Sequence, residues 1–402
     1  MNIGIVTMWF ERGAGYVSLQ YRQSFSLQHN VFVYARSGED RKGDPVWDDA
    51  NVTWGKSSNL PVATAIDRQD FETWIKEKKI DLVFFNEQHW WEPLGWCLDL
   101  GVKTGAYIDY YTEKTIPFFA AYDFLICNTH RHYSAFDWHP QAFYVPWGTD
   151  LELFKPKSFE PCNPDKITFF HSCGYSPQRK GTDFIIAAFK NITKPAKLII
   201  HSQANLLEAL PTQSKMIQEL QDKGSLECIQ QTVTAPGLYH LGDVYLGLSR
   251  LEGLGLPLIE AQACGLAVVT CDNPPMNEFI TEGLGSVAKI DRLWSRNDGY
   301  YWPQCAPNIQ SLTEILDFQA GQFDRIRELK QAVRRHAEEK FNWMDRSKSI
   351  NDIVGGIAVD TVRKTNAVKQ SLNFERSSQG IMYRTALNYP LLWNMYQQIK
   401  KK

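Results

Sequence analysis

Short runs of β-branched, aliphatic and aromatic residues recur along this chain of 402 residues, separated by longer stretches of helical character. This alternation is typical of βα units, in which consecutive strands pair in parallel and helices cover the sheet. In the first half the expected strands are residues 3–7, 31–34, 52–54, 82–86, 104–108, 124–128 and 143–146. In the second half they are residues 167–171, 197–201, 227–231, 244–248, 267–271 and 287–289. The sequence therefore predicts an α/β protein with two doubly wound, Rossmann-like sheets.

A polar linker joins the two halves. Pro156, Pro161 and Pro164 interrupt it, and it shows no clear hydrophobic period. The length suits two domains of roughly 150 residues each. Open α/β sheets bind ligands at the carboxyl ends of their strands, so we expect the two domains to face each other across a ligand cleft. The expected boundaries are 1–155 for the first domain, 156–348 for the second, and 349–402 for a helical tail that packs back on the body.

Two glutamates, Glu252 and Glu260, flank a glycine-rich turn in the second half. A strand-like run precedes the turn, and a compact helix that opens near Pro257 follows it. Gly253 and Gly255 let a ligand approach the backbone closely, and the free N–H groups of the first helical turn attract phosphate. The segment is therefore suited to a nucleotide-sugar diphosphate.

In this interpretation Glu260 accepts hydrogen bonds from ribose hydroxyls, and Glu252 faces a sugar or its developing positive charge. The alternative is purely structural. The glycines would make a tight turn, Glu252 would be solvated, and Glu260 would complement the helix dipole.

A second turn, after the strand at 167–171, carries the adjacent cations Arg179 and Lys180 before a helix at 184–189. Cations at this point would neutralise a leaving diphosphate without a metal ion. The alternative is a solvated loop. In either case Thr182 or Asp183 is expected to cap the helix.

The first half offers weaker signals. Gly15 belongs to a lone G-x-G after the first strand, which lacks the third glycine of a dinucleotide fingerprint and suggests only a glycine turn near the cleft. Polar clusters follow two further strands and contain His89, Asp109 and Glu113. Asp109 or His89 would polarise an acceptor hydroxyl, with Glu113 as a further acceptor-side candidate. The alternative is that the carboxylates cap helices and the histidine is a core residue.

Composition excludes several classes of protein. The net charge of −2 provides no basic field for nucleic acid. The eight cysteines form no C-x-x-C pair, which argues against zinc ribbons and favours reduced thiols in the cytoplasm. His130 and His132 have no third ligand nearby in the sequence, so no metal site is expected. The amino terminus has no signal-peptide pattern, and no apolar stretch approaches ~20 residues, so no membrane span is expected.

An apolar stripe marks the end of the chain. It consists of Leu391, Leu392, Met395, Tyr396 and Ile399, ahead of the lysines at 400–402. Either this is a helix packed on the body, or it makes a peripheral contact with the inner face of the membrane. We expect the packed helix.

Taken together, these motifs resemble the large retaining glycosyltransferase family of the GT-B type, known as glycosyl transferases group 1 and often numbered family 4. The most specific element is residues 252–260 with Ala261, Cys264 and Gly265, which looks like the family's two-glutamate motif. The residues at 180–181 match its lysine–glycine turn. The residues at 147–150 resemble the segment that closes the first domain, and those at 341–343 resemble the end of the second.

The resemblance implies roles for these residues. Glu260 would bind the ribose, Glu252 the donor sugar and Lys180 the diphosphate, and the backbone of Gly253, Leu254, Gly255 and Leu256 would contact sugar and phosphate. Members need no metal or other cofactor and keep the anomeric configuration.

The chain also departs from the family pattern. Tyr175 replaces an arginine of the diphosphate turn, for which Arg179 would substitute. Asp109 stands where many members have a histidine. A stiffer segment at 273–278 replaces a glycine pair, which would reshape the sugar pocket.

The resulting hypothesis is a retaining enzyme that moves a hexose-type sugar from a UDP- or GDP-sugar to a saccharide or lipid-linked acceptor. The catalytic candidates are Glu252, Asp109 and Lys180. The main alternative is a non-catalytic GT-B module that binds a nucleotide sugar or a partner protein. A nucleotide-sugar epimerase with the same fold is a third hypothesis without specific support.

Overall fold

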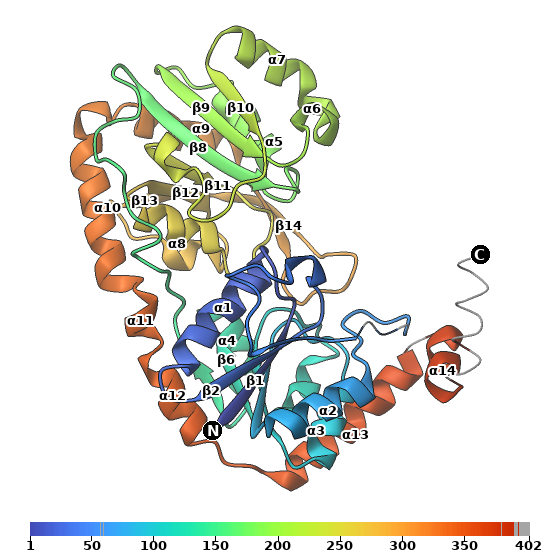
Figure 1. Ribbon diagram of the computed structural model, residues 1–402. Helices are drawn as coiled ribbons and strands as arrows, with labels where there is room; N and C mark the ends of the chain where they lie inside the picture. The colour runs from blue at the N-terminus through green and yellow to red at the C-terminus, as the bar shows by residue number, and fades with distance from the viewer. Residues whose placement is uncertain (57, 59, 379, 390–392, 394–402) are drawn as a thin grey trace. The chain divides into compact units, whose positions relative to one another are not determined.

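The computed structural model describes all residues except 57, 59, 379, 390–392 and 394–402. The chain divides into two compact units, here called unit 1 (Met1–Pro146 with Ser347–Lys402) and unit 2 (Trp147–Arg346). Each unit is built on one parallel sheet with helices packed against it (Figure 1).

Unit 1 contains a seven-stranded sheet in the order β3-β2-β1-β4-β5-β6-β7, with every neighbouring pair parallel. Its strands are β1 (Asn2–Thr7), β2 (Asn30–Ala35), β3 (Val52–Trp54), β4 (Leu82–Phe85), β5 (Lys103–Tyr107), β6 (Phe124–Cys127) and β7 (Ala142–Tyr144). Between them lie α1 (Gly13–Phe25), α2 (Arg68–Lys78), α3 (Glu92–Asp99), α4 (His130–Phe136), and the 3₁₀ helices η1 (Glu39–Arg41) and η2 (Ile116–Ala121).

Unit 2 contains a six-stranded parallel sheet in the order β10-β9-β8-β11-β12-β13. Its strands are β8 (Ile167–Gly174), β9 (Ala196–Ser202), β10 (Leu226–Gln230), β11 (Val244–Gly247), β12 (Ala267–Cys271) and β13 (Gly285–Ala288). Its α-helices are α5 (Thr182–Phe189), α6 (Leu206–Ala209), α7 (Ser214–Asp222), α8 (Leu256–Ala263), α9 (Ile309–Ala320), α10 (Ile326–Lys340) and α11 (Trp343–Arg346). Its 3₁₀ helices are η3 (Pro211–Gln213), η4 (Tyr239–Leu241), η5 (Met276–Phe279) and η6 (Phe323–Arg325).

The predicted architecture of two doubly wound parallel sheets is confirmed, and every strand expected from the sequence is present. The inner strands β4, β6, β11 and β12 are buried along their whole length. Strands covered by helices on both faces must be apolar throughout, which is why continuous apolar runs located them correctly.

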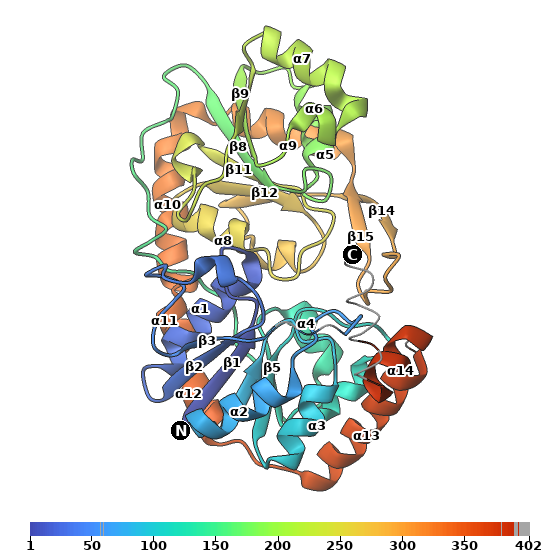
Figure 2. The same ribbon diagram turned by 45° about the vertical axis from the view of Figure 1, so that its right-hand side comes forward.

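One element of unit 2 was not predicted. The strands β14 (Ile290–Trp294) and β15 (Gln304–Pro307) form an antiparallel hairpin between β13 and α9 (Figure 2). The middle of β14 is exposed, so its sequence lacks the apolar run by which the buried strands were recognised.

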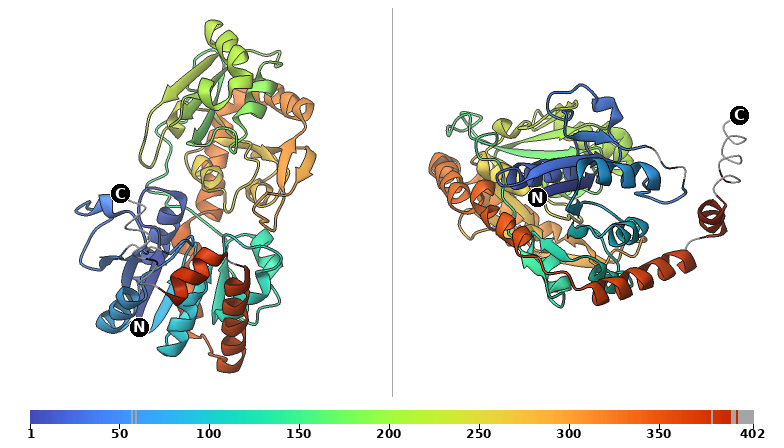
Figure 3. Two further views of the ribbon diagram at one scale, coloured as in Figure 1. Left: turned by 90° about the vertical axis from the view of Figure 1, so that its right-hand side faces the viewer. Right: turned by 60° about the horizontal axis from the view of Figure 1, so that its bottom comes forward.

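The C-terminal helices belong to unit 1 and pack on its outer surface (Figure 3). They are α12 (Lys348–Gly355), α13 (Thr361–Ser378) and α14 (Ile381–Asn388). Helix α12 packs on α1, where the Asn351 amide donates a 2.9 Å hydrogen bond to the Ser24 carbonyl, and α13 packs on α3 and η2. The apolar stripe predicted at Leu391, Leu392, Met395, Tyr396 and Ile399 lies outside the described residues. Within the described part of the chain, none of the helices has the length and apolar character that crossing a bilayer requires.

A buried ion pair attaches α13 to the sheet of unit 1. Lys364 Nζ lies 2.6 Å from a carboxylate oxygen of Asp123, and their side chains are 2% and 0% exposed. The same oxygen accepts a 2.7 Å hydrogen bond from the Thr104 amide at the start of β5. Because Asp123 has no access to water, it depends on Lys364 for neutralisation.

We expect Lys364→Met to lower the free energy of unfolding by about 3–5 kcal/mol, because it leaves a buried carboxylate without its cation. Urea unfolding of the full chain measures the change. Lys369→Met, at an exposed position of the same helix, is the matched control and should change stability by less than about 0.5 kcal/mol. Equal effects of the two substitutions would contradict the role assigned to this ion pair.

Candidate active site

The strand order of unit 2 reverses between β8 and β11, which are neighbours in the middle of the sheet. Doubly wound sheets bind ligands at such a point, outside the carboxyl ends of the two strands, because the following loops separate there. The β8–α5 loop carries Arg179 and Lys180, and the β11–α8 loop carries Glu252. The topology therefore brings together two motifs that are 72 positions apart in the sequence.

Glu252 is the centre of this cluster. One carboxylate oxygen lies 2.5 Å from Lys180 Nζ and accepts a 2.6 Å hydrogen bond from the Ser249 hydroxyl. The other oxygen lies 3.5 Å from the Arg179 guanidinium. Burial alone would raise the pKa of Glu252, but Lys180 and Arg179, with the hydrogen bonds from Lys180 and Ser249, lower it to about 2. Glu252 is therefore ionised and paired, which differs from the solvated side chain of the structural alternative.

Both loops end in a glycine that caps a helix. Gly255 (φ 81°) precedes α8 and Gly181 (φ 71°) precedes α5, and both have left-handed backbones that favour glycine. A Cβ at Gly181 would lie 1.9 Å from the Leu248 carbonyl oxygen, so only glycine lets the two loops pack together.

The expectation that Thr182 or Asp183 caps α5 is wrong, because Gly181 occupies the capping position without a side-chain hydrogen bond. Thr182 is instead the first residue of the helix, and its hydroxyl bonds His171 Nε2 at 2.8 Å. Asp183 forms an ion pair with Arg250.

The rest of the glycine-rich segment lies as follows. Leu254 is buried, Leu256 is the first residue of α8, and Pro257 is in the first helical turn, as expected. A Cβ at Gly253 would meet no other atom within 4 Å, so its surroundings leave space on that side of the loop.

Glu260 lies one turn into α8. The Tyr239 hydroxyl donates a 2.5 Å hydrogen bond to one carboxylate oxygen of Glu260. Burial raises the pKa of Glu260 to about 7, although the Tyr239 hydrogen bond and the charge of Lys180 act to lower it. The two glutamates of the motif therefore have opposite electrostatic environments. When their surroundings shift the pKa values of two carboxyl groups in opposite directions, the groups differ in protonation near neutral pH and can perform different chemical roles.

Tyr175, where the chain departs from the family pattern, and Arg179, the residue expected to substitute for the missing arginine, are both near the surface. The Tyr175 side chain is 73% exposed. Arg179 donates to the Leu251 carbonyl at 3.3 Å as well as approaching Glu252, so its charge lies beside the β11–α8 loop.

The first-half candidates are in unit 1. Asp109 and His89 follow β5 and β4, which are adjacent strands. Burial raises the pKa of Asp109 to about 7 and lowers that of His89 to about 4. Arg36 donates to the carbonyls of Asn86 and Glu87 at 2.7 and 2.9 Å, and its charge stabilises the ionised form of Asp109.

The two remaining candidates of unit 1 are not part of this cluster of charges. Glu113 is exposed. Gly15 lies inside the first turn of α1 rather than in a glycine turn before it, and a Cβ there would lie 2.1 Å from the Phe10 carbonyl oxygen. The glycine is therefore explained by close packing.

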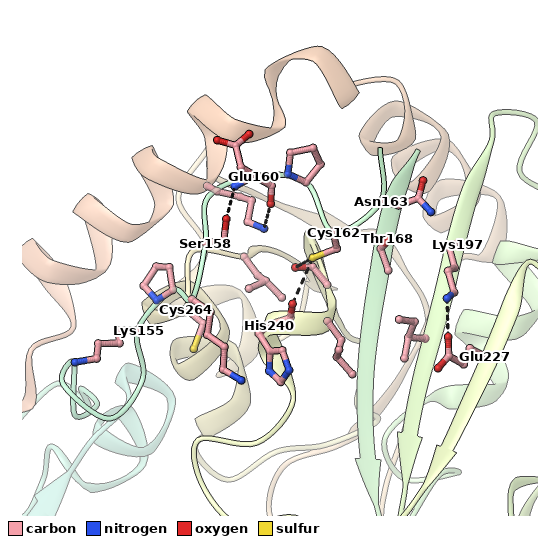
Figure 4. A pocket seen from close by; sticks show the side chains of 18 residues that line it. Lys155, Ser158, Glu160, Cys162, Asn163, Thr168, Lys197, Glu227, His240 and Cys264 are labelled. Carbon is pink, nitrogen blue, oxygen red and sulfur yellow. Dashed lines mark hydrogen bonds and ion pairs between the residues drawn. The ribbon is translucent and has the colours of Figure 1, made fainter. Parts of the chain in front are cut away.

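A separate pocket of about 370 Å³ in unit 2 does not contain the candidate residues (Figure 4). It is lined by Thr168, Lys197 and Glu227, the second residues of β8, β9 and β10, so it lies at the amino ends of the strands. Lys197 and Glu227 pair with each other at 2.6 Å. This pocket is at the opposite edge of the sheet from Lys180 and Glu252.

Sequence reasoning missed several partners of the candidate residues. Ser249, three positions before Glu252, was detectable as a polar residue of the same turn. Arg36 directly follows β2, the same strand-end signal that identified Asp109. Tyr239 gives no local signal, because its contact with Glu260 depends on the packing of η4 beside α8. Among the described residues, no group of three or more His, Cys, Asp or Glu side chains is placed to hold a metal ion.

Two doubly wound parallel sheets with C-terminal helices define the GT-B class of glycosyltransferase folds, and solved structures match this arrangement. Anabaena HepE, solved with UDP and glucose, is 13% identical with a TM-score of 0.66, over 88% of this chain and 99% of HepE. Sucrose-phosphate synthase from Thermosynechococcus elongatus is 17% identical with a TM-score of 0.64, over 88% of this chain and 98% of that protein. At these identities the likeness shows the fold.

Residues 165–296 match the family model described as Glycosyl transferases group 1, which confirms the predicted resemblance to that group over this part of unit 2. A curated relative is the GDP-mannose-dependent monoacylated alpha-(1-6)-phosphatidylinositol monomannoside mannosyltransferase of Corynebacterium glutamicum. It is 25% identical over 248 residues, which are 56% of this chain and 58% of the relative. The match therefore spans little more than half of each protein.

The raised pKa of Glu260 predicts a pH-dependent effect of Glu260→Gln, which keeps an acceptor for Tyr239 but carries no charge. The pKa is about 7 in the folded protein against an ordinary value of 4.5, so wild-type stability falls as pH rises through this window. The variant lacks this loss. Its free energy of unfolding relative to wild type should increase by on the order of 2 kcal/mol between about pH 4.5 and pH 7.5. Urea unfolding across the range tests this, and a constant difference would contradict it.

Proposed function

We propose that the protein is a glycosyltransferase that moves a sugar from a UDP- or GDP-sugar to a saccharide or lipid-linked acceptor with retention of the anomeric configuration. The observation that carries the proposal is the contact between Lys180 and Glu252 at the switch point of unit 2, beside the amino end of α8. This arrangement offers a cation and helix-end amides to a diphosphate, and a carboxylate to sugar hydroxyls.

Donor binding exchanges partners within this cluster. The diphosphate takes Lys180, and the amides of Gly255 and Leu256 add hydrogen bonds from the start of α8. Glu252, released from Lys180, accepts hydrogen bonds from the donor sugar, and Arg179 and the Ser249 hydroxyl continue to favour its ionised form. Glu260 binds the ribose hydroxyls with the carboxylate that Tyr239 orients.

The reaction breaks the bond between the anomeric carbon and the diphosphate oxygen. The acceptor oxygen forms its bond to the same face of the sugar, and the acceptor proton moves to the leaving phosphate. Lys180 and Arg179 stabilise the negative charge that develops on the leaving nucleoside diphosphate. Because side-chain cations provide this stabilisation, the proposal requires neither a metal ion nor another cofactor.

Unit 1 provides the acceptor-side candidates. Asp109, whose pKa of about 7 leaves it partly ionised near neutral pH, and His89, whose pKa of about 4 leaves it neutral there, can each accept a hydrogen bond from an acceptor hydroxyl and polarise it. Glu113 stays a prediction from the sequence. The proposed place of action is the cytoplasm or the inner face of the membrane.

The names of similar proteins include both kinds of donor and a lipid-linked acceptor. The name of the C. glutamicum relative specifies GDP-mannose as the donor and a phosphatidylinositol monomannoside as the acceptor. HepE was solved with UDP and with UDP-glucose. A screen of UDP- and GDP-sugars by thermal unfolding therefore tests the proposal directly, since a ligand that binds only the folded protein raises its apparent stability.

We expect Lys180→Met to weaken binding of UDP or GDP by about 10- to 100-fold, because a charge-assisted bond to phosphate contributes about 1.5–3 kcal/mol. Isothermal titration calorimetry measures the change. Lys197→Met is the matched control, since it removes a lysine from an equally close ion pair at the other edge of the same sheet. Unchanged binding in the Lys180 variant would count against the proposed donor site.

We expect transfer or donor hydrolysis to survive EDTA, because Lys180 and Arg179 supply the charge that a metal would otherwise provide. Release of free UDP or GDP from the donor, followed with and without chelator, checks this. Inhibition that added Mg²⁺ or Mn²⁺ reverses would contradict it. Donor binding without turnover over a broad acceptor panel would instead favour the non-catalytic nucleotide-sugar-binding module.

A further inference from the structure

Arg250 connects the two loops of the candidate donor site. Its guanidinium makes a two-pronged ion pair with Asp183 at the start of α5, with N–O distances of 2.8 and 2.7 Å. The same guanidinium donates to the Gln178 carbonyl in the β8–α5 loop. The Arg250 amide donates to the Arg179 carbonyl at 2.9 Å. One residue of the β11–α8 loop therefore contacts the residues on both sides of Lys180.

The surroundings hold this connection in one geometry. The Arg250 guanidinium lies 4.1 Å from the centroid of the Phe184 ring, and the Arg250 and Asp183 side chains are only 12% and 19% exposed. The Arg250 carbonyl accepts a 2.9 Å hydrogen bond from the Cys305 amide of β15. Shielding from water strengthens each of these contacts, and the planar guanidinium can satisfy Asp183 and Gln178 together.

The contacts of Arg250 lie next to the ion pair between Lys180 and Glu252. Arg250 is two positions before Glu252, and Gln178 is two positions before Lys180. Lys180 and Glu252 have to separate when a diphosphate takes the lysine. The Arg250 contacts do not involve Lys180 or the Glu252 carboxylate, so they can keep the two loops in register while the partners exchange.

We infer that Arg250 and Asp183 form a positioning pair that holds Lys180 at the diphosphate site. The inference rests on the proposed donor site and concerns residues that act through the loops rather than by touching the donor. A misplacement of about 1 Å in a group that positions a substrate can cost an enzyme about 100-fold in rate, so residues that hold such a group in place affect function without touching the ligand.

For Asp183→Asn, a purely electrostatic effect and a positioning role predict different changes in the affinity for a nucleoside diphosphate. Removing a carboxylate near an anion site adds net positive charge, which by itself tightens or leaves unchanged the binding of a nucleoside diphosphate. Positioning predicts weaker binding, since the helix start loses its ion pair with Arg250. Arg250→Lys gives a second test, because lysine keeps the charge but cannot make the two-pronged contact and reach Gln178 together.

The experiment is calorimetric titration of UDP and GDP into wild type, Asp183→Asn and Arg250→Lys. We expect both variants to bind about tenfold more weakly than wild type. Glu227→Gln is the matched control, since it removes a carboxylate from a 2.6 Å ion pair with Lys197 in the same unit, and should bind as wild type does. Tighter or unchanged binding in both variants would overturn the inference.

Hydrogen–deuterium exchange of the ligand-free proteins separates this inference from the proposed function. We expect faster exchange in residues 176–183 and 249–255 of both variants, with the rest of unit 2 unchanged. If wild type binds neither UDP nor GDP, the donor-site proposal fails, while the exchange data still test the positioning pair. Wild-type exchange rates in both loops would overturn the inference whatever the nucleotides do.

Discussion

The parallel pairing of β8 with β11 is the constraint on which the candidate site depends. Parallel strands end at the same edge of a sheet, so the loops that follow β8 and β11 emerge side by side and place Lys180 in contact with Glu252. Close packing of the loops requires Gly181, because any side chain there would collide with the Leu248 carbonyl. The contact between Lys180 and Glu252 therefore depends both on the strand order and on the glycine.

The two glutamates of the motif show how burial and charge divide the work of a binding site. Glu252 lies between Lys180, Arg179 and Ser249, and these partners overcome the effect of burial and keep it ionised. Glu260 has Tyr239 as its hydrogen-bond partner, and burial brings its pKa close to neutrality. A strongly ionised group suits a site where charge develops, and a group near its pKa suits hydrogen bonding to neutral hydroxyls.

A buried ion pair between a lysine and an aspartate lies at the amino end of each of the two sheets. In unit 1, Lys364 of α13 neutralises Asp123 just before β6, and in unit 2, Lys330 of α10 neutralises Asp243 just before β11. Each aspartate also accepts a backbone hydrogen bond from the start of a neighbouring strand. Helices that come late in the chain are thereby fastened to the edge of the sheet opposite the candidate site, which leaves the carboxyl edge to the loops that carry chemistry.

The sequence by itself determined the two parallel sheets and the chemical character of the donor loops. Buried parallel strands must be apolar on both faces, and glycines beside a helix start predict a phosphate site, so both signals are local. The hairpin β14–β15 was not predicted, because its exposed strand has no apolar run. Only the tertiary structure decided which side chains meet, namely Tyr239 with Glu260 and Arg250 with Asp183. It also decided that Gly181, rather than Thr182, caps α5. These contacts join residues that are distant in sequence or depend on the packing of two loops, and a local pattern contains no information about such neighbours.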